Sequence, residues 1–373
     1  MSFALREIRR AKVRFGLLVA SVGLLVFLIL FQQALQDGLV TSFVGAIRNQ
    51  SAPVLVYSVD GRRNIQGSVI TPEVAEQIRG VEGVGRAGQL GQATLSVRVG
   101  SGTNTVALIG YDTEGLGSPR SLSAGRLPER EGEVVALASA AGEGFALGDT
   151  VAVEPGGVEL EVVGHAEEIG LQASITLFGD FGTFQSAVQA VNPDAAGAPP
   201  AVLAVEPAEG TTAEELVERI DEAVPDAEAL TRSDAADLSP GVAQVRQSFQ
   251  LIFLLFGLVV PLVTGLFFLI ITLQKAGSLT LLRAAGAPAA ALVRSLLFQA
   301  GLVLVAGIAL GVALYTPLSS RRIGDIPLRF SPTAVIVWAC VLFGLGLLST
   351  LFSARRVLAI DPIEATSGGG TGT

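Results

Sequence analysis

Residues 251–273 (LIFLLFGLVVPLVTGLFFLIITL) form an uncharged run of twenty-three residues, and this run constrains the fold more than any other feature of the sequence. At a helical rise of about 1.5 Å per residue, such a helix spans roughly 34 Å, slightly more than the hydrocarbon core of a bilayer. The run ends at the polar pair Gln274 and Lys275. It therefore predicts a transmembrane helix.

Three further apolar runs have the same character, at residues 15–35, 296–314 and 334–351. Each is long enough to cross a bilayer, and none of the four runs contains Asp, Glu, Lys or Arg. The first run exceeds the apolar core of a secretory signal, and no small-x-small cleavage pattern follows it. We therefore expect four permanent transmembrane helices.

Charge separates the long segment between the first two runs from the rest of the chain. Residues 36–250 carry 30 acidic residues against 12 arginines and no lysine, a formal charge of −18, whereas the remainder carries +9. This pattern predicts an acidic soluble domain attached to a basic membrane part, and it argues against binding to nucleic acid. The only cysteine, Cys340, lies in the fourth run, so this domain contains no disulfide and depends on its own hydrophobic core.

The short loops predict the orientation of the chain. The three segments expected on one side of the membrane carry ten Lys and Arg residues, and the short loop on the other side carries three. Because positive charge marks the cytoplasmic side, we expect a multi-pass protein of the cell (inner or plasma) membrane with both termini in the cytoplasm and the large domain outside.

The fold class expected is an α-helical membrane protein with four transmembrane helices and an α+β extracytoplasmic domain inserted between helices 1 and 2. Within that domain, Thr71 followed by Pro72 indicates a helix start, Thr212 with Glu215 forms a capping box, and residues 94–111 read as a β-hairpin. The predicted segments are an interfacial helix at 1–14, spans at 15–35, 251–273, 295–317 and 334–352, the domain with helical stalks at 36–250, a cytoplasmic coupling segment at 274–294, an external loop at 318–333 and a cytoplasmic tail at 353–373. A plain basic flank is an equally good interpretation of residues 1–14.

Residue types that catalysis requires are scarce. The two lysines, Lys12 and Lys275, follow Ala and Gln, so neither belongs to a phosphate-binding P-loop. The single histidine, His165, lies in a β-type run, where we interpret it as a residue at the end of a sheet strand. We therefore expect no catalytic residue, no metal site and no cofactor in this chain. Weak Ca²⁺ binding by the carboxylates is the less favoured alternative to a solvated acidic face.

Short motifs in a fixed order resemble the MacB/FtsX-like family of ABC transporter permeases, in its four-span DevC and haem-exporter (HrtB-like) branch. They are LTLLRAAGA at 279–287, FALGDTV at 145–151, ARRVLAIDPIEA at 354–365 and the FQQALQDGL region within 12–42. The order of one span, a large external domain and three further spans also matches. The resemblance implies a homodimeric permease subunit that exports an amphiphile such as a lipid, haem, a drug or a peptide. It also implies a separate cytoplasmic ATPase as the partner that binds ATP and Mg²⁺.

The segment at 279–287 is the expected ATPase coupling site, because an apolar knob beside a cation suits docking into a groove on the ATPase better than a simple cytoplasmic turn. Its residues are Leu279, Leu281, Leu282, Arg283, Ala284, Gly286 and Ala287. The family's acidic residue and glycine are replaced here by Ser278 and Thr280. Gly307 and Gly311 form a small-xxx-small pattern for helix packing, within the chain or at a dimer seam.

Three functions of different classes are compatible with the sequence. The first is the ABC permease, with a cytoplasmic ATPase, a second copy of itself and membrane lipid as partners. The second is a mechanotransmitter that moves no cargo and instead regulates an extracytoplasmic protein partner, such as a cell-wall hydrolase. A third is an ATP-independent receptor.

Overall fold

The computed structural model describes residues 12–112, 115–195, 197, 199–274, 288–319, 322–323, 326–328 and 331–358. The chain forms two compact units. The helical unit contains Met1–Asp37 and Gln247–Thr373, and the α+β domain contains Gly38–Arg246. The chain passes from one unit to the other inside two helices, α2 (Lys12–Arg48) and α7 (Val242–Gln274). The predicted interfacial helix at 1–14 lies almost wholly outside the described residues.

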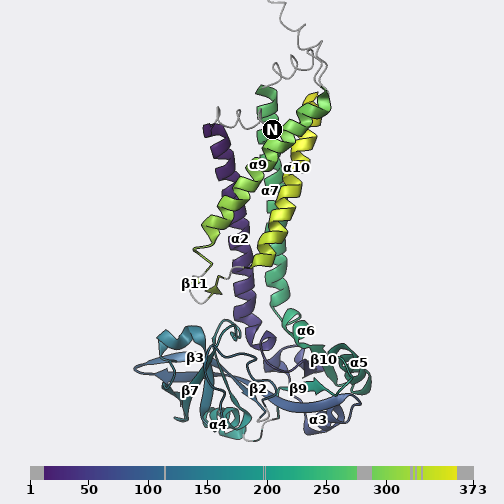
Figure 1. The fold of residues 1–373 in the computed structure, drawn as a ribbon. Coiled ribbons are helices and arrows are strands. Elements are labelled where there is room, and N and C mark those ends of the chain that lie inside the picture. Colours follow the sequence, from purple (N-terminus) through teal and green to yellow (C-terminus); the bar gives the residue numbers. More distant parts are fainter. Residues whose placement is uncertain are drawn as a thin grey trace, which may run out of the picture. The chain divides into compact units, whose positions relative to one another are not determined.

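Long apolar helices make up the helical unit. Besides α2 and α7 it contains α9 (Ala289–Tyr315) and α10 (Pro332–Leu358), which pack against each other (Figure 1). A short pair of strands, β11 (Arg322–Ile323) and β12 (Ile326–Pro327), lies between α9 and α10 in the chain. Each of the four helices is long and apolar enough to cross a membrane, within Phe15–Arg48, Val242–Val263, Val293–Tyr315 and Pro332–Phe352. The expectation of four apolar spans around an inserted domain is confirmed.

A ten-stranded mixed sheet organises the α+β domain, in the order β10-β1-β9-β2-β3-β8-β5-β7-β4, with β6 paired to β2 and β7. The pairs β3–β8 and β5–β7 are parallel, and the others are antiparallel. The strands are β1 (Val54–Ser58), β2 (Val84–Val99), β3 (Gly102–Tyr111), β4 (Ala124–Gly125), β5 (Glu133–Leu137), β6 (Thr150–Glu154), β7 (Glu159–Ala166), β8 (Ile175–Asp180), β9 (Val202–Pro207) and β10 (Ala227–Thr231). The predicted hairpin is β2–β3, which turns at Gly100 with φ +56°.

Capping residues start the helices of the domain, two of them where the sequence predicted. The Thr71 side chain accepts the backbone N–H of Val74 at the start of α3 (Pro72–Arg79), and Thr212 and Glu215 form the predicted capping box of α5 (Ala213–Ala223). Asp180 caps α4 (Phe181–Val191), and Thr231 caps the short α6 (Arg232–Asp237). The 3-10 turns η1 (Val59–Gly61), η2 (Ile65–Gly67), η3 (Ala138–Glu143) and η4 (Pro193–Ala195) complete the domain.

Three hydrophobic cores lie on the faces of the sheet. One packs α3 and α5 against the β10-β1-β9 end, and a second packs α4 against β2, β3, β6 and β8 (Figure 1). Along β1, Val54 and Val56 belong to the core under α3 and α5, whereas Leu55 and Tyr57 belong to the third core. The strand is therefore buried on both faces, which explains its unbroken apolar sequence. The third core receives the end of α2 and positions the site described next.

Candidate functional site

The predicted ATPase coupling residues, Leu279 to Ala287, lie outside the described residues. Their docking role stays a prediction. The predicted helix-packing glycines are described and lie against α2. A Cβ added to Gly307 would come within 2.5 Å of Val22 Cγ1, and one added to Gly311 would come within 2.6 Å of Val26 Cβ. Glycine at both positions permits this close approach of α9 to α2 within one chain.

The single histidine and the single cysteine, side chains that could serve catalysis or metal binding, lie in a strand and a helix. His165 lies near the end of β7, is 8% exposed, and its Nε2 lies 2.7 Å from the carbonyl oxygen of Phe145. Cys340 is on α10. Within the part of the chain that the structure describes, no group of three or more His, Cys, Asp or Glu side chains is arranged to hold a metal ion.

The candidate functional site is the region where α2 and α7 enter the α+β domain, and we name this region the stalk junction. The first half of this junction is the end of α2. The helix is interrupted at Val44, which has non-helical angles of φ −135° and ψ 15°. A loop of residues 167–174, which we name the collar loop, lies against this interruption, and Leu171 in the loop forms a β-bridge with Val44.

Main-chain hydrogen bonds hold the interrupted helix against the collar loop. The Ala46 N–H donates to the Gly170 carbonyl at 3.0 Å, and the Gln172 and Ala173 N–H groups donate to the Phe43 and Ser42 carbonyls at 3.0 and 2.9 Å. A helix interruption leaves main-chain groups without their usual partners, and these bonds satisfy them. The Asn49 side chain adds a bond of 2.8 Å to the Glu168 carbonyl.

Glycine is required on both sides of this contact. A Cβ added to Gly45 would lie 2.3 Å from the Glu168 carbonyl oxygen, and one added to Gly170 would lie 3.0 Å from Ser42 Cα. Both distances are much shorter than an ordinary van der Waals contact. The two backbones can approach this closely because neither position carries a side chain.

The second half of the junction comprises α6 and the start of α7, and it is held by charge. Asp237 at the end of α6 accepts hydrogen bonds from Arg48 Nη2 at 2.9 Å and from Arg246 Nη2 at 2.5 Å. Partial burial is the largest single influence on the pKa of Asp237 and raises it, but the hydrogen bonds and charges of Arg246 and Arg48 together hold this pKa below its ordinary value. One carboxylate thus bridges the last residue of α2 and the first turns of α7.

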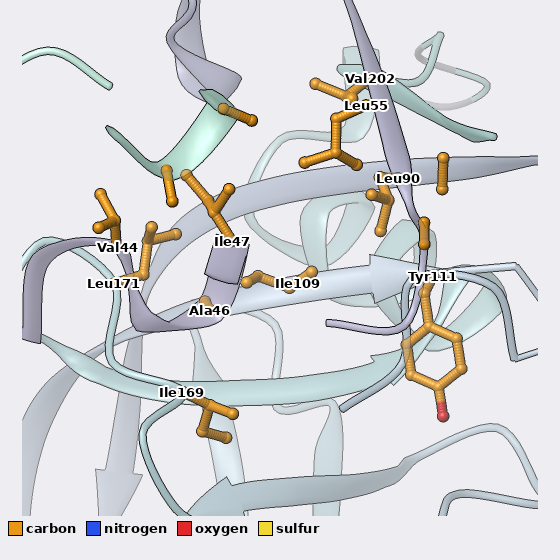
Figure 2. Close-up of a cluster of buried hydrophobic side chains, with 14 of the residues drawn as sticks. Val44, Ala46, Ile47, Leu55, Leu90, Ile109, Tyr111, Ile169, Leu171 and Val202 are labelled. Atoms are coloured by element: carbon orange, nitrogen blue, oxygen red, sulfur yellow. The ribbon is translucent and has the colours of Figure 1, made fainter. Parts of the chain in front are cut away.

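Both halves of the junction share one hydrophobic core. Val44 and Ile47 of α2 are 4% and 5% exposed, and they pack in the same cluster as Ala236 of α6 and Val242 of α7. Figure 2 shows Val44 beside Leu171, and Ile47 belongs to the same cluster as Ile109 of the sheet. A displacement of either helix therefore disturbs side chains that contact the other.

Most of this junction was not foreseen from the sequence. The predicted stalk helix continues to Arg48, but its interruption at Val44 depends on the collar loop, which is more than a hundred residues away in the chain. Glycine at positions 45 and 170 is the sequence feature that could have indicated the close approach of the two backbones. The bridge at Asp237 had no local signal, because its partners lie 189 and 9 residues away in the sequence.

No family model matches the chain. It is 23% identical to the putative hemin transport system permease protein HrtB of Staphylococcus haemolyticus, over 99% of each chain. It is 24% identical to an uncharacterized ABC transporter permease of Mycobacterium tuberculosis, over 98% of this chain and 99% of that one.

Two solved structures align with part of the chain. The periplasmic region of MacB from Actinobacillus actinomycetemcomitans covers 50% of this chain and 92% of that one, with 17% identity and a TM-score of 0.36. The extracellular domain of the ABC-type transporter YknZ from Gram-positive bacteria covers 48% and 99%, with 11% identity and a TM-score of 0.35. The similarity to the two permeases extends over nearly every residue and includes all four apolar helices. The chain is therefore a distant full-length homologue of HrtB and other ABC transporter permeases.

Proposed function

We propose that this chain is the transmembrane subunit of a homodimeric ABC exporter that extrudes an amphiphilic or hydrophobic substrate, driven by a separate cytoplasmic ATPase. The observation that carries this proposal is the full-length similarity to ABC transporter permeases. Such a permease needs an ATPase, because it supplies the membrane path and the partner supplies the energy. Hemin, the cargo in the name of one relative, is itself an amphiphile.

The charge distribution supports the proposed orientation of the chain in the membrane. The segments at 1–14, 274–294 and 353–373 together carry ten Lys and Arg residues and belong on the cytoplasmic side, and the acidic domain belongs outside. Residues 279–287 then face the compartment that contains the ATPase. An apolar knob with one cation is suited to a groove on that subunit. In the sequence, α7 begins at the stalk junction and ends at Gln274, shortly before this knob.

The experiment is a substitution in the proposed knob. Leu282→Asp places a charge where an apolar contact is expected, so co-purification of an ABC ATPase and substrate-stimulated ATP hydrolysis should fall at least tenfold. Membrane insertion, measured by protease mapping of the loops, should not change. Ser278→Asp is the matched control, because it adds the same charge at the position where the family carries an acidic residue, and binding should persist.

Unchanged ATPase binding and activity in Leu282→Asp would contradict the docking role. A knob located on the outer face by protease mapping would contradict the proposed orientation as well.

The mechanotransmitter is the second candidate function, and the stalk junction is the observation that favours it. Both connections enter one core and are bridged by Asp237, which suits the delivery of motion to the domain whether or not a cargo moves. Efflux measured in vesicles that contain the chain and its ATPase distinguishes the two functions. ATP-dependent release of a hydrophobic dye or of hemin indicates export, whereas ATP hydrolysis without release, together with a cell-wall defect in the deletion strain, indicates mechanotransmission.

A further inference from the structure

A proline interrupts the hydrogen bonding of α7 in the middle of its apolar run. Pro261 lies at the centre of residues 251–273, and the helix continues on both sides of it, from Val242 to Gln274. Proline has no N–H to donate, and its ring crowds the carbonyl four residues earlier, which here is the carbonyl of Gly257. This turn therefore lacks one of the main-chain bonds that stiffen the other turns of the helix.

Little of the surrounding chain braces this turn. Among the described residues, no atom beyond the neighbouring helix backbone lies within 4 Å of a Cβ added to Gly257. The side chains of Leu258 and Leu262 are 63% and 57% exposed. Only 6% of the apolar stretch of α7 is buried within the chain, against 39% in α9. A bend at this turn therefore displaces few packed side chains.

Two contacts with α10 hold α7 at the proline and before it. Ser349 Oγ donates to the Pro261 carbonyl at 2.7 Å. Earlier on α7, the ring of Phe253 lies against that of Trp338, with the centroids 5.0 Å apart. A hydroxyl from a neighbouring helix is a usual means of stabilising a proline-containing turn inside a membrane, because no water is present there to bond the backbone.

The part of α7 that follows the proline presents its large side chains outward. Leu266, Ile270 and Leu273 are 51%, 50% and 49% exposed. We propose that residues 257–261 form a hinge at which residues 262–274 change direction, while the part of α7 before the turn stays against α10. In this arrangement the hydrogen bond from Ser349 limits the bend.

The hinge belongs to the chain itself, and only the identity of its driver rests on the proposed function. Residues 262–274 lead directly into the segment proposed to bind the ATPase. A bend at the proline allows that segment to follow the ATPase through a wide angle. The part of α7 before the turn then passes a smaller displacement to the stalk junction.

Distances between spin labels on the purified full-length chain in nanodiscs, without an ATPase, test the hinge. One pair of labels is attached at Leu17→Cys of α2 and Ile270→Cys of α7, which are 61% and 50% exposed, in a Cys340→Ser background. Helix α2 is the reference because it packs closely on α9, which packs on α10. Labelled chains are diluted with unlabelled ones, so that only distances within one chain contribute. We expect a broad distribution for this pair.

A second pair of labels reports the part of α7 before the turn. The positions are Leu28→Cys of α2 and Leu254→Cys of α7, in the same Cys340→Ser background. We expect a narrow distribution for this pair, because the neighbouring Phe253 is held by Trp338. A second pair as broad as the first would overturn the proposal, since α7 would then move as a whole.

Replacement of the proline is the direct test. Pro261→Ala restores the N–H that bonds to the Gly257 carbonyl, so the distribution for the Leu17 and Ile270 labels should narrow to about half its width or less. Equal widths in Pro261→Ala and the parent would overturn the proposal. The second part of α7 would then be either fixed or mobile for another reason.

Replacement of the hydroxyl should have the opposite effect. Ser349→Ala removes the bond that limits the bend, so the same distribution should broaden. Thr350→Val is the matched control, because the hydroxyl of Thr350 bonds to the Gly346 carbonyl of its own helix at 2.8 Å, and the width should not change. Equal widths in the two variants would contradict the role of Ser349. Because Leu282→Asp tests the proposed function separately, a failure of the label measurements overturns the hinge alone.

Discussion

The end of α2 is held by main-chain hydrogen bonds to the collar loop, whereas the start of α7 is held by side-chain charges at Asp237. The apolar stretches of the two helices also differ in burial. In α2, 39% of the stretch is buried within the chain, against 6% in α7. Main-chain bonds across two glycines tolerate little displacement, but ion pairs between half-exposed side chains re-form easily. The end of α2 is therefore a fixed connection, and the start of α7 is an adjustable one.

The largest expected effect comes from closing the space between α2 and the collar loop. Gly45→Val places side-chain atoms where even a Cβ would lie 2.3 Å from the Glu168 carbonyl oxygen. The backbones must separate, and we expect the domain to lose roughly 3 kcal/mol of stability. Denaturant unfolding of the purified chain, followed by hydrogen exchange in the domain, measures this loss.

Gly16→Ala is the control on the same helix, because among the described residues no atom beyond its own neighbouring helix backbone lies within 4 Å of the added Cβ. That variant should match or slightly exceed the parent in stability. If residues 42–46 exchange at the wild-type rate in Gly45→Val, the end of α2 does not depend on close approach to the collar loop. That result would contradict the distinction between the two connections.

An ion pair with a buried carboxylate, away from both connections, gives the next largest effect. Glu133, with a side chain 7% exposed, accepts from both terminal nitrogens of Arg126 at 2.6 Å. The hydrogen bonds from Arg126 are the main reason that the pKa of Glu133 falls to about 2. Glu133→Gln should cost the domain about 1.5–3 kcal/mol at neutral pH.

The pH dependence of this variant follows from the lowered pKa. A carboxylate with a lowered folded-state pKa contributes fully above its unfolded-state pKa, roughly 4.3, and that contribution is lost as pH falls toward 2. The stability difference between the parent and Glu133→Gln should therefore shrink across this window. Hydrogen exchange at the stalk junction should not change, and a change there would show that the two connections are not independent of the rest of the domain.

The smallest effect is expected at the adjustable connection. Asp237→Asn removes the charge that Arg48 and Arg246 share, which should cost about 1 kcal/mol. Exchange should accelerate in the first turns of α7 and stay slow at residues 42–46. Because the pKa of Asp237 is also lowered, the effect should be present at neutral pH and fade as pH falls through the folded-state pKa.

Equal acceleration at both connections in Asp237→Asn would contradict the distinction between them. Asp234→Asn at the start of α6 is a control for the loss of a carboxylate, since Asp234 bonds to Thr231 rather than to an arginine. It should leave exchange in α7 unchanged.

The sequence predicted the features that depend on local chemistry. The apolar runs, the caps at Thr71 and Thr212 and the β2–β3 hairpin are each specified by neighbouring residues, and the structure contains them. The interruption at Val44 was not predictable, because helical spacing continues through it and the collar loop that stabilises it is distant in the chain. The unpartnered amide of Gln92 was equally hidden, since only the folded sheet shows which side chains surround it.

Hydrogen exchange of the complex between this chain and an ABC ATPase tests most directly the proposal that the ATPase moves the stalk junction. The exchange of residues 238–246 should differ between the ADP state and the ATP-vanadate state, while residues 42–46 remain protected in both. Leu282→Asp should remove that difference. Identical exchange at residues 238–246 in both states of a wild-type complex that hydrolyses ATP would contradict the account.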